Sequence, residues 1–355
     1  MIRVPGSMPN IILEGFCKEL VIFMPMQPNK NIKNFLNYFL GPLLFIWLVF
    51  SIYRQINSQQ HLEAWWSNIK ASLQSAKVIY LIIVILLVPV NWGIEAVKWK
   101  LSINPIYPIR FWEAFKAVLS GVSFSVTMPN RVGEYLGRML YLPDGNRLKT
   151  ISITLMGSIS QLLITLIAGT VGFIYLKDYL LHSGTINSLW YRFILVGLII
   201  VMLILTLFYF QISALERLME RWLKNNRYLY LVQSLHWFDG QLLGRLLLLS
   251  LARYSIFVIQ YVLLFNLFEV YVPLDLQINT MGVIFLALAI IPSIALVEVV
   301  LRGEVSLTLM GLFTTNSLGI GLTSVSIWLI NLVLPAIIGS LLILNVKVFK
   351  RNETT

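Results

Sequence analysis

Two short polar motifs interrupt apolar stretches of the chain, and each carries an acid and a base. The first is Pro129-Asn130-Arg131-Val132-Gly133-Glu134 followed by Arg138, and the second is Pro292-Ser293 followed by Glu298 and Arg302. In both, a glutamate stands four residues before an arginine, a spacing that places the two side chains on one face of a helix. Ionisable residues at membrane depth are costly and mark functional sites by default. The repeated pair therefore predicts a substrate-binding site.

The first motif has the residue types that hold a phosphate group. Pro129 lacks an amide hydrogen and disfavours helix at the residue before it, so one helix should end there and another begin near Arg131. The free amides of that new helix attract anions, and Arg131 and Arg138 can bind phosphate oxygens through their planar guanidinium groups. Gly133 would allow close backbone approach, and Glu134 would balance the arginines or hold an amine. The alternative is that both Glu–Arg pairs are structural and pin broken helices.

Two more polar residues inside apolar stretches join the candidate substrate-binding residues. Arg253 must find a partner or extend towards the membrane surface, and we expect Glu298 to be that partner. Gln161, with Ser160 beside it, lies midway along a predicted span, as Asn331 does in the second half of the chain. These positions predict polar groups facing the interior of the protein.

A mixed cluster lies at the end of another predicted span. Glu95 and Lys98 are three residues apart, which predicts an ion pair at the membrane interface. Trp92 and Trp99 flank them, and tryptophans at such positions are typical of the aromatic belts at membrane surfaces. The serine-rich run 120–127 is typical of close helix packing.

Composition places these motifs in a membrane. Hydrophobic residues make up 58% and charged residues 12% of the chain, and the mean hydropathy is +0.79. Soluble domains carry about 25% charged residues. The sequence therefore predicts an all-α polytopic membrane protein.

Charge and cysteine content exclude several other classes. The net charge of +11 would suggest nucleic acid for a soluble protein, but here Lys and Arg fall between apolar runs. That placement indicates membrane topology, with anionic lipid headgroups as partners at the cytoplasmic face and no nucleic acid. Cys17 is the only cysteine, and the three histidines are scattered. We therefore expect no disulfide, no metal site and no cofactor.

Apolar runs of about 20 residues predict six full transmembrane helices. They lie near 35–53, 77–97, 151–176, 190–212, 247–268 and 322–346. Two further regions, about 112–142 and 280–318, are split by the polar motifs and predict broken helical hairpins, either re-entrant or fully spanning. The distribution of Lys and Arg favours both termini in the cytoplasm and insertion in the inner, cytoplasmic membrane.

With that topology the two halves become inverted copies. Repeat one covers about 77–176 and repeat two about 247–346, within a membrane domain of 35–346 that follows an N-terminal segment of 1–34 and precedes a basic tail of 347–355. Inverted repeats with broken helices meeting at the midplane are the architecture of alternating-access transporters. Outer faces rich in Trp and Phe suit lipid and homo-oligomer contacts equally.

The order and spacing of these motifs support a family resemblance. The motifs are Trp92 to Trp99, Pro129 to Arg138, the polar span at 157–172 and Pro292 to Glu304. Together they make the chain resemble the transmembrane, flippase-like region of lysylphosphatidylglycerol synthases, as a stand-alone member without the aminoacyltransferase domain. The resemblance implies a non-enzymatic translocase that moves a phospholipid or related charged lipid between leaflets. The alternatives are a polytopic glycosyltransferase or lipid-modifying enzyme, and a membrane scaffold that transports nothing.

Overall fold

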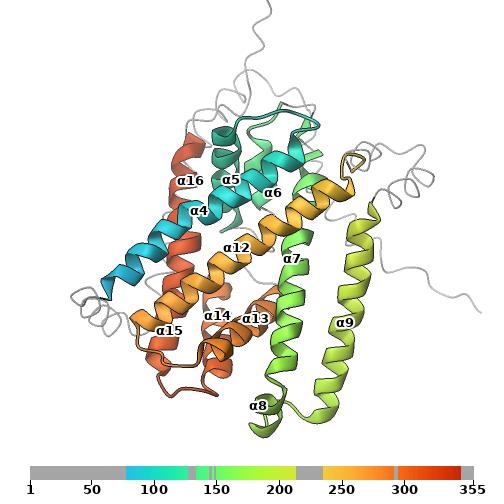
Figure 1. The fold of residues 1–355 in the computed structure, drawn as a ribbon. Coiled ribbons are helices and arrows are strands. Elements are labelled where there is room, and N and C mark those ends of the chain that lie inside the picture. The colour runs from blue at the N-terminus through green and yellow to red at the C-terminus, as the bar shows by residue number, and fades with distance from the viewer. Residues whose placement is uncertain are drawn as a thin grey trace, which may run out of the picture.

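The protein is described by a computed structural model that covers residues 77–126, 133–143, 146–147, 149–212, 235–291 and 295–344, without the side chains of 295–297 and 344. The span expected at 35–53, the motif residues 129–132 and the motif residues 292–294 lie outside this part of the chain. The described part is built from helices (Figure 1).

Five helices in the described part are long and apolar enough to cross a membrane, with lengths of 23 to 28 residues. They are α4 (Val78–Ile103), α7 (Lys149–Tyr175), α9 (Ser188–Phe210), α12 (Gly240–Leu267) and the continuous segment of α15 (Ser317–Trp328), η3 (Leu329–Val333) and α16 (Leu334–Leu344). A short helix, α8 (Lys177–His182), joins α7 to α9. These spans confirm five of the six that the sequence predicts, and the helical membrane fold with them.

The π-helical turn η3 follows from a proline. Pro335 has no amide hydrogen, so the carbonyl of Asn331 lacks its usual helical partner four residues on. A single π turn accommodates such a break, and π turns often occur at functional sites. The turn leaves the Asn331 side chain buried in the interior.

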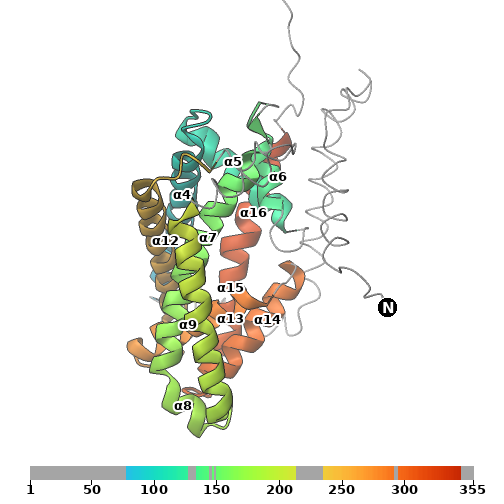
Figure 2. The same ribbon diagram turned by 90° about the vertical axis from the view of Figure 1, so that its right-hand side faces the viewer.

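Two pairs of shorter helices coincide with the predicted broken regions. The first pair is α5 (Phe111–Ser125) and α6 (Gly133–Met139), and the second is α13 (Leu274–Ile290) and α14 (Ala295–Met310). Each helix has 17 residues or fewer. Pro129 and Pro292 fall in the sequence between the two helices of each pair, outside the described residues. The two pairs lie at opposite ends of the molecule (Figures 1 and 2).

Helices from the two halves of the chain pack on each other. The helix α4 packs along α12, α5 along α16, and α13 along α7. Small residues permit these contacts: a side chain at Gly339 would meet the Leu119 carbonyl, and one at Gly172 would meet the Asn279 carbonyl. At one end of the α4 and α12 pair, the Lys77 amine lies 2.6 Å from the Glu269 carboxylate, and this hydrogen bond raises the pKa of Lys77.

The contact between α5 and α16 also depends on a serine from the serine-rich run. Ser123 donates a hydrogen bond of 2.6 Å to the Ala336 carbonyl, which confirms the predicted packing role. We expect Ser123→Ala to lower the free energy of unfolding by about 0.6 to 1 kcal/mol. Ser255→Ala, at an exposed serine bonded within its own helix, should change it little. Unfolding in mixed micelles measures both, and equal values for the two variants would contradict the packing role.

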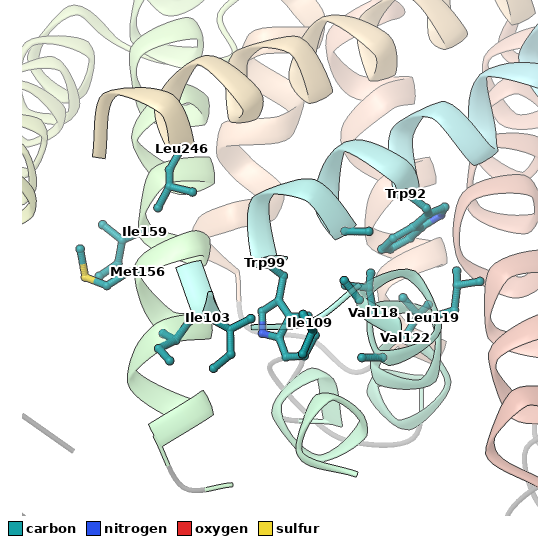
Figure 3. Close-up of a cluster of buried hydrophobic side chains, with 14 of the residues drawn as sticks. Trp92, Trp99, Ile103, Ile109, Val118, Leu119, Val122, Met156, Ile159 and Leu246 are labelled. Carbon is teal, nitrogen blue, oxygen red and sulfur yellow. The ribbon is translucent and has the colours of Figure 1, made fainter. Parts of the chain in front are cut away.

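The interior contains two tryptophans that the sequence analysis placed at the membrane surface. Trp92 and Trp99 lie in a buried cluster with side chains of α5, α7 and α12 (Figure 3). Trp99 is only 2% exposed. The prediction of belt anchors was therefore wrong, because both rings face other helices.

Candidate functional site

The centre of the site is Glu95 on α4, which contacts three basic side chains from three helices. Its Oε1 accepts a hydrogen bond of 2.9 Å from Arg138 of α6, and its Oε2 accepts one of 2.6 Å from Arg253 of α12. The amine of Lys98 lies 3.2 Å from the same Oε2. Glu95 is 5% exposed, Lys98 and Arg138 are each 2% exposed, and Arg253 is 8% exposed. One carboxylate thus ties α4, α6 and α12 together in the interior.

The predicted pair in the first motif forms as well. Arg138 Nη2 donates to Glu134 Oε2 at 3.3 Å while it also binds Glu95. The side chain of Glu134 is 16% exposed, so this acid lies at the edge of the cluster. Buried ion pairs contribute little net stability when complete, but removing one partner costs several kcal/mol, about 3 to 5. The cluster is therefore sensitive to loss of any single charge.

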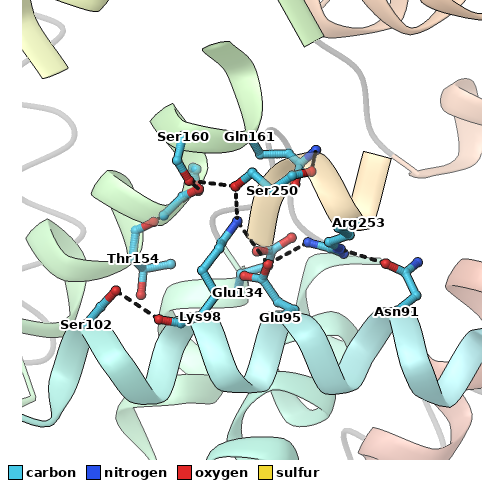
Figure 4. Close-up of polar contacts among 12 residues, drawn as sticks. Asn91, Glu95, Lys98, Ser102, Glu134, Thr154, Ser160, Gln161, Ser250 and Arg253 are labelled. Carbon is cyan, nitrogen blue, oxygen red and sulfur yellow. Dashed lines mark hydrogen bonds and ion pairs between the residues drawn. The ribbon is translucent and has the colours of Figure 1, made fainter. Parts of the chain in front are cut away.

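A chain of amides runs from Arg253 on α12 to Asn91 on α4 and returns through Asn331 to Gln260 on α12. Arg253 Nε donates to Asn91 at 2.9 Å (Figure 4). The guanidinium carbon also lies 4.8 Å from the centroid of the Trp92 ring. Asn91 donates to Asn331 at 3.4 Å, and Asn331 donates to Gln260 at 3.0 Å. Asn331 was predicted to face the interior. Its side chain therefore links Asn91 on α4 to Gln260 on α12.

On the other side of the cluster the polar contacts reach α7. Lys98 donates to Ser250 at 3.2 Å, and Ser250 shares a hydrogen bond of 2.8 Å with Ser160. Gln161 donates to the Ser250 carbonyl at 3.4 Å (Figure 4). Ser160 and Gln161 on α7 thus hydrogen-bond to α12 at one end of the network. Asn331 on η3 does so at the other end.

The second motif forms a smaller site on α14. Arg302 Nη2 donates to Glu298 at 2.6 Å, and Arg302 Nη1 donates to the Tyr261 hydroxyl of α12 at 2.9 Å. Tyr261 follows Gln260 in sequence, so the backbone of α12 connects this pair to the amide chain. Both Glu–Arg pairs predicted from the sequence are therefore present, and both are anchored on a long helix.

Two predictions for individual residues were wrong, and a third concerns a residue that the structure does not describe. The ion pair of Arg253 is with Glu95, whereas the sequence analysis named Glu298. The space beside Gly133 is filled by the backbone of Phe124 in α5, so this glycine allows helix packing and not the approach of a ligand. Arg131 lies outside the described residues.

The residues at the centre of the site were not among those that the sequence predicted to bind substrate. Glu95 and Lys98 were predicted as an interface pair, yet they are buried at the centre of the cluster. Asn91, Ser250 and Gln260 were not singled out. Each is a polar residue inside an apolar span, and that pattern could have identified all three.

The arrangement can bind charged groups, and the described residues offer little for other chemistry. Among them, no group of three His, Cys, Asp or Glu side chains could hold a metal ion. The guanidinium and ammonium groups donate in directions suited to carboxylate or phosphate oxygens. The cluster is therefore a buried ionic network that joins α4, α6 and α12.

The fold and the site together define an integral membrane protein with interrupted helices around a buried ionic cluster. A family model described as the lysylphosphatidylglycerol synthase TM region matches residues 38–339. The chain belongs to this family, as the motifs in its sequence predicted. No curated protein matches the chain.

Proposed function

We propose that the protein is a lipid translocase that moves a phospholipid or related charged lipid between the leaflets of the membrane. The observation that carries the proposal is the buried ionic cluster around Glu95, which joins broken and continuous helices inside a membrane domain. Charges at such depth are costly and are retained where they line a substrate or ion pathway. Family membership supports the same function.

The contacts of the two hairpins support an inverted repeat. Arg138 reaches back 43 residues to Glu95, and Arg302 reaches back 41 residues to Tyr261, so each hairpin arginine binds the first long helix of its own half. The hairpins lie at opposite ends of the molecule (Figure 2), and the helix contacts between halves are reciprocal. In this proposal the hairpins are re-entrant and alternate in opening the cluster to each leaflet.

Basic residues support an orientation with both termini in the cytoplasm. At the α5 end of the molecule, the starts of α5, α7 and α12 and the end of α4 carry Lys100, Arg110, Arg147, Lys149 and Arg245. The described residues at the α13 end carry fewer basic side chains, namely Lys77, Lys177 and Arg192. In this proposal the α5 end faces the cytoplasm, as the positive-inside rule favours. Anionic lipid headgroups are the proposed partners there, and the apolar outer face of α9 suits lipid or a second copy.

A transport assay with matched variants tests the proposal. In proteoliposomes containing a fluorescent phospholipid, the protein should expose inner-leaflet lipid to a membrane-impermeant quencher. We expect Arg302→Gln to reduce that rate at least about tenfold, because the second hairpin loses its contacts to both Glu298 and Tyr261. Glu304→Gln, at an exposed acid on the same helix, should keep the rate of the unmodified protein.

The same assay separates translocation from the alternatives. A transferase would convert a lipid donor into product without changing quencher access, and a scaffold would do neither. Translocation is rejected if liposomes with folded protein show the same accessible fraction as empty liposomes for anionic and zwitterionic lipids alike.

A further inference from the structure

Two threonine hydroxyls near the start of α7 are buried without a hydrogen bond. Thr150 is 0% exposed and Thr154 is 2% exposed, and neither hydroxyl oxygen has a partner among the described residues. A threonine inside a helix can donate to the carbonyl four residues back, as Thr165 does to Gln161. Thr154 does not use the equivalent carbonyl. Because buried polar groups are nearly always satisfied in native proteins, these two hydroxyls indicate partners other than protein atoms, and water is the usual one.

The face of α7 that carries Thr154 is turned towards Lys98 on α4. A side chain added at Gly157, three residues further along α7, would meet the Lys98 Cε carbon at 3.5 Å. Residues three apart share a helix face, and Figure 4 shows Thr154 beside Lys98 and Ser102. Ser102 is buried one turn after Lys98, and its hydroxyl donates to the Lys98 carbonyl at 3.0 Å. Hydroxyl groups of both helices therefore line the contact between α4 and α7, from Lys98 towards the α5 end.

Lys98 is a group that could use such a path for protons. An amine can release a proton, whereas the guanidinium groups that also contact Glu95 stay charged in proteins. The Lys98 ammonium donates to Ser250 at 3.2 Å, and Ser250 shares a hydrogen bond of 2.8 Å with Ser160. The ionisable groups around it come from four helices: Glu95 on α4, Glu134, Tyr135 and Arg138 on α6, Tyr209 on α9 and Arg253 on α12.

We propose that water enters between α4 and α7 from the α5 end and lets Lys98 exchange a proton with the aqueous phase on that side. One N–H bond of the ammonium breaks, the proton passes to water at Thr154 and leaves along the water molecules, and the amine regains a proton by the reverse route. Glu95 contacts both Lys98 and Arg138 of the first hairpin, so proton loss from Lys98 changes the charge that Glu95 shares with α6. The inference rests on the proposed function and adds H⁺ to it as the coupling ion.

Cysteine labelling of the full chain in proteoliposomes tests for the water. Cys17 is the only cysteine of the sequence, so Cys17→Ser provides a background without thiols. In that background, Thr154→Cys should react with a charged methanethiosulfonate, present on both sides of the membrane, at least about tenfold faster than Leu155→Cys. Leu155 is the matched control because it lies at nearly the same depth and is 46% exposed on the outer face of α7. Equal rates for the two folded variants would show a dry contact and overturn the proposal.

Acetylation of lysines in the folded protein tests the proton exchange directly. Only a neutral amine reacts with acetic anhydride, so Lys98 should be acetylated at a rate that rises with pH, as measured by mass spectrometry. Thr154→Val keeps the size of the side chain and removes the hydroxyl, and it should lower the Lys98 rate at least about threefold. Lys116, exposed on α5, should keep its rate in both proteins. An unreactive Lys98, or the same Lys98 rate in Thr154→Val, would contradict the proposal.

The water path and the proposed translocation fail separately. Labelling and acetylation do not depend on transport, so positive results without quencher access would reject translocation and retain proton exchange at Lys98. Where lipid is translocated, a pH gradient should change the rate at least about twofold, and Lys98→Met should remove this dependence while Lys116→Met keeps it. Translocation at a rate that ignores the gradient would overturn the assignment of H⁺ as the coupling ion.

Discussion

Replacing Glu95 with glutamine is expected to lower the free energy of unfolding by about 3 to 5 kcal/mol, the cost of breaking a buried ionic contact. The amide preserves the shape of the side chain but removes the carboxylate that contacts all three of Lys98, Arg138 and Arg253. Denaturation of the purified protein in mixed micelles measures the loss.

A matched acid and a second-site change distinguish electrostatics from packing. Glu304→Gln, at an exposed acid on α14, should change the free energy of unfolding by less than about 0.5 kcal/mol. Adding Arg253→Met to Glu95→Gln removes one of the cations that Glu95 contacts and should recover at least about 1 kcal/mol. If Glu95→Gln costs less than about 1 kcal/mol, or if Arg253→Met adds to its cost, the ionic contacts do not hold these helices together.

The elements of the fold could be predicted because they depend on local properties of the sequence. Runs of apolar residues located α4, α7, α9 and α12 to within several residues, since a membrane sets a minimum length for a spanning helix. The prolines of the two motifs located the breaks between α5 and α6 and between α13 and α14. The Glu–Arg spacing predicted both ion pairs within α6 and α14, because four residues make about one helical turn.

The long-range partners could not be predicted in the same way. A helix that is apolar all round gives no sign of which face meets another helix, so Trp92 and Trp99 were placed at the surface when they face the core. The choice of Glu95 rather than Glu298 as the partner of Arg253 depends on α4 packing along α12. That packing joins residues 158 positions apart and leaves no local pattern in the sequence.

Gly133 shows the same limit for a backbone feature. A glycine between a proline break and a Glu–Arg pair predicted close approach of a ligand, and close approach does occur. The approaching group is the backbone of Phe124, because α6 folds back on α5. The sequence identified the need for a small residue but not the neighbour that imposes it.

The tight packing of this first hairpin predicts that Gly137→Val will prevent correct folding. A side chain at position 137 would meet the backbone of Gly121 and Ser120, and backbone atoms within a helix cannot move aside as the end of a flexible side chain can. The added methyl groups would separate α6 from α5 and carry the adjacent Arg138 away from Glu95. We expect a loss of about 3 kcal/mol or more in the free energy of unfolding.

A valine at a second glycine provides the control for that experiment. Gly244 on α12 has open space where its side chain would lie, so Gly244→Val should retain most of the stability and give the same monodisperse peak in size-exclusion chromatography as the unmodified protein. Valine is also less favourable than alanine in helices, so the comparison should be repeated with alanine. We expect Gly137→Ala to be less stable than Gly244→Ala. If Gly137→Val is as stable as Gly244→Val, α6 does not pack on α5 as described, and Arg138 does not depend on that contact to reach Glu95.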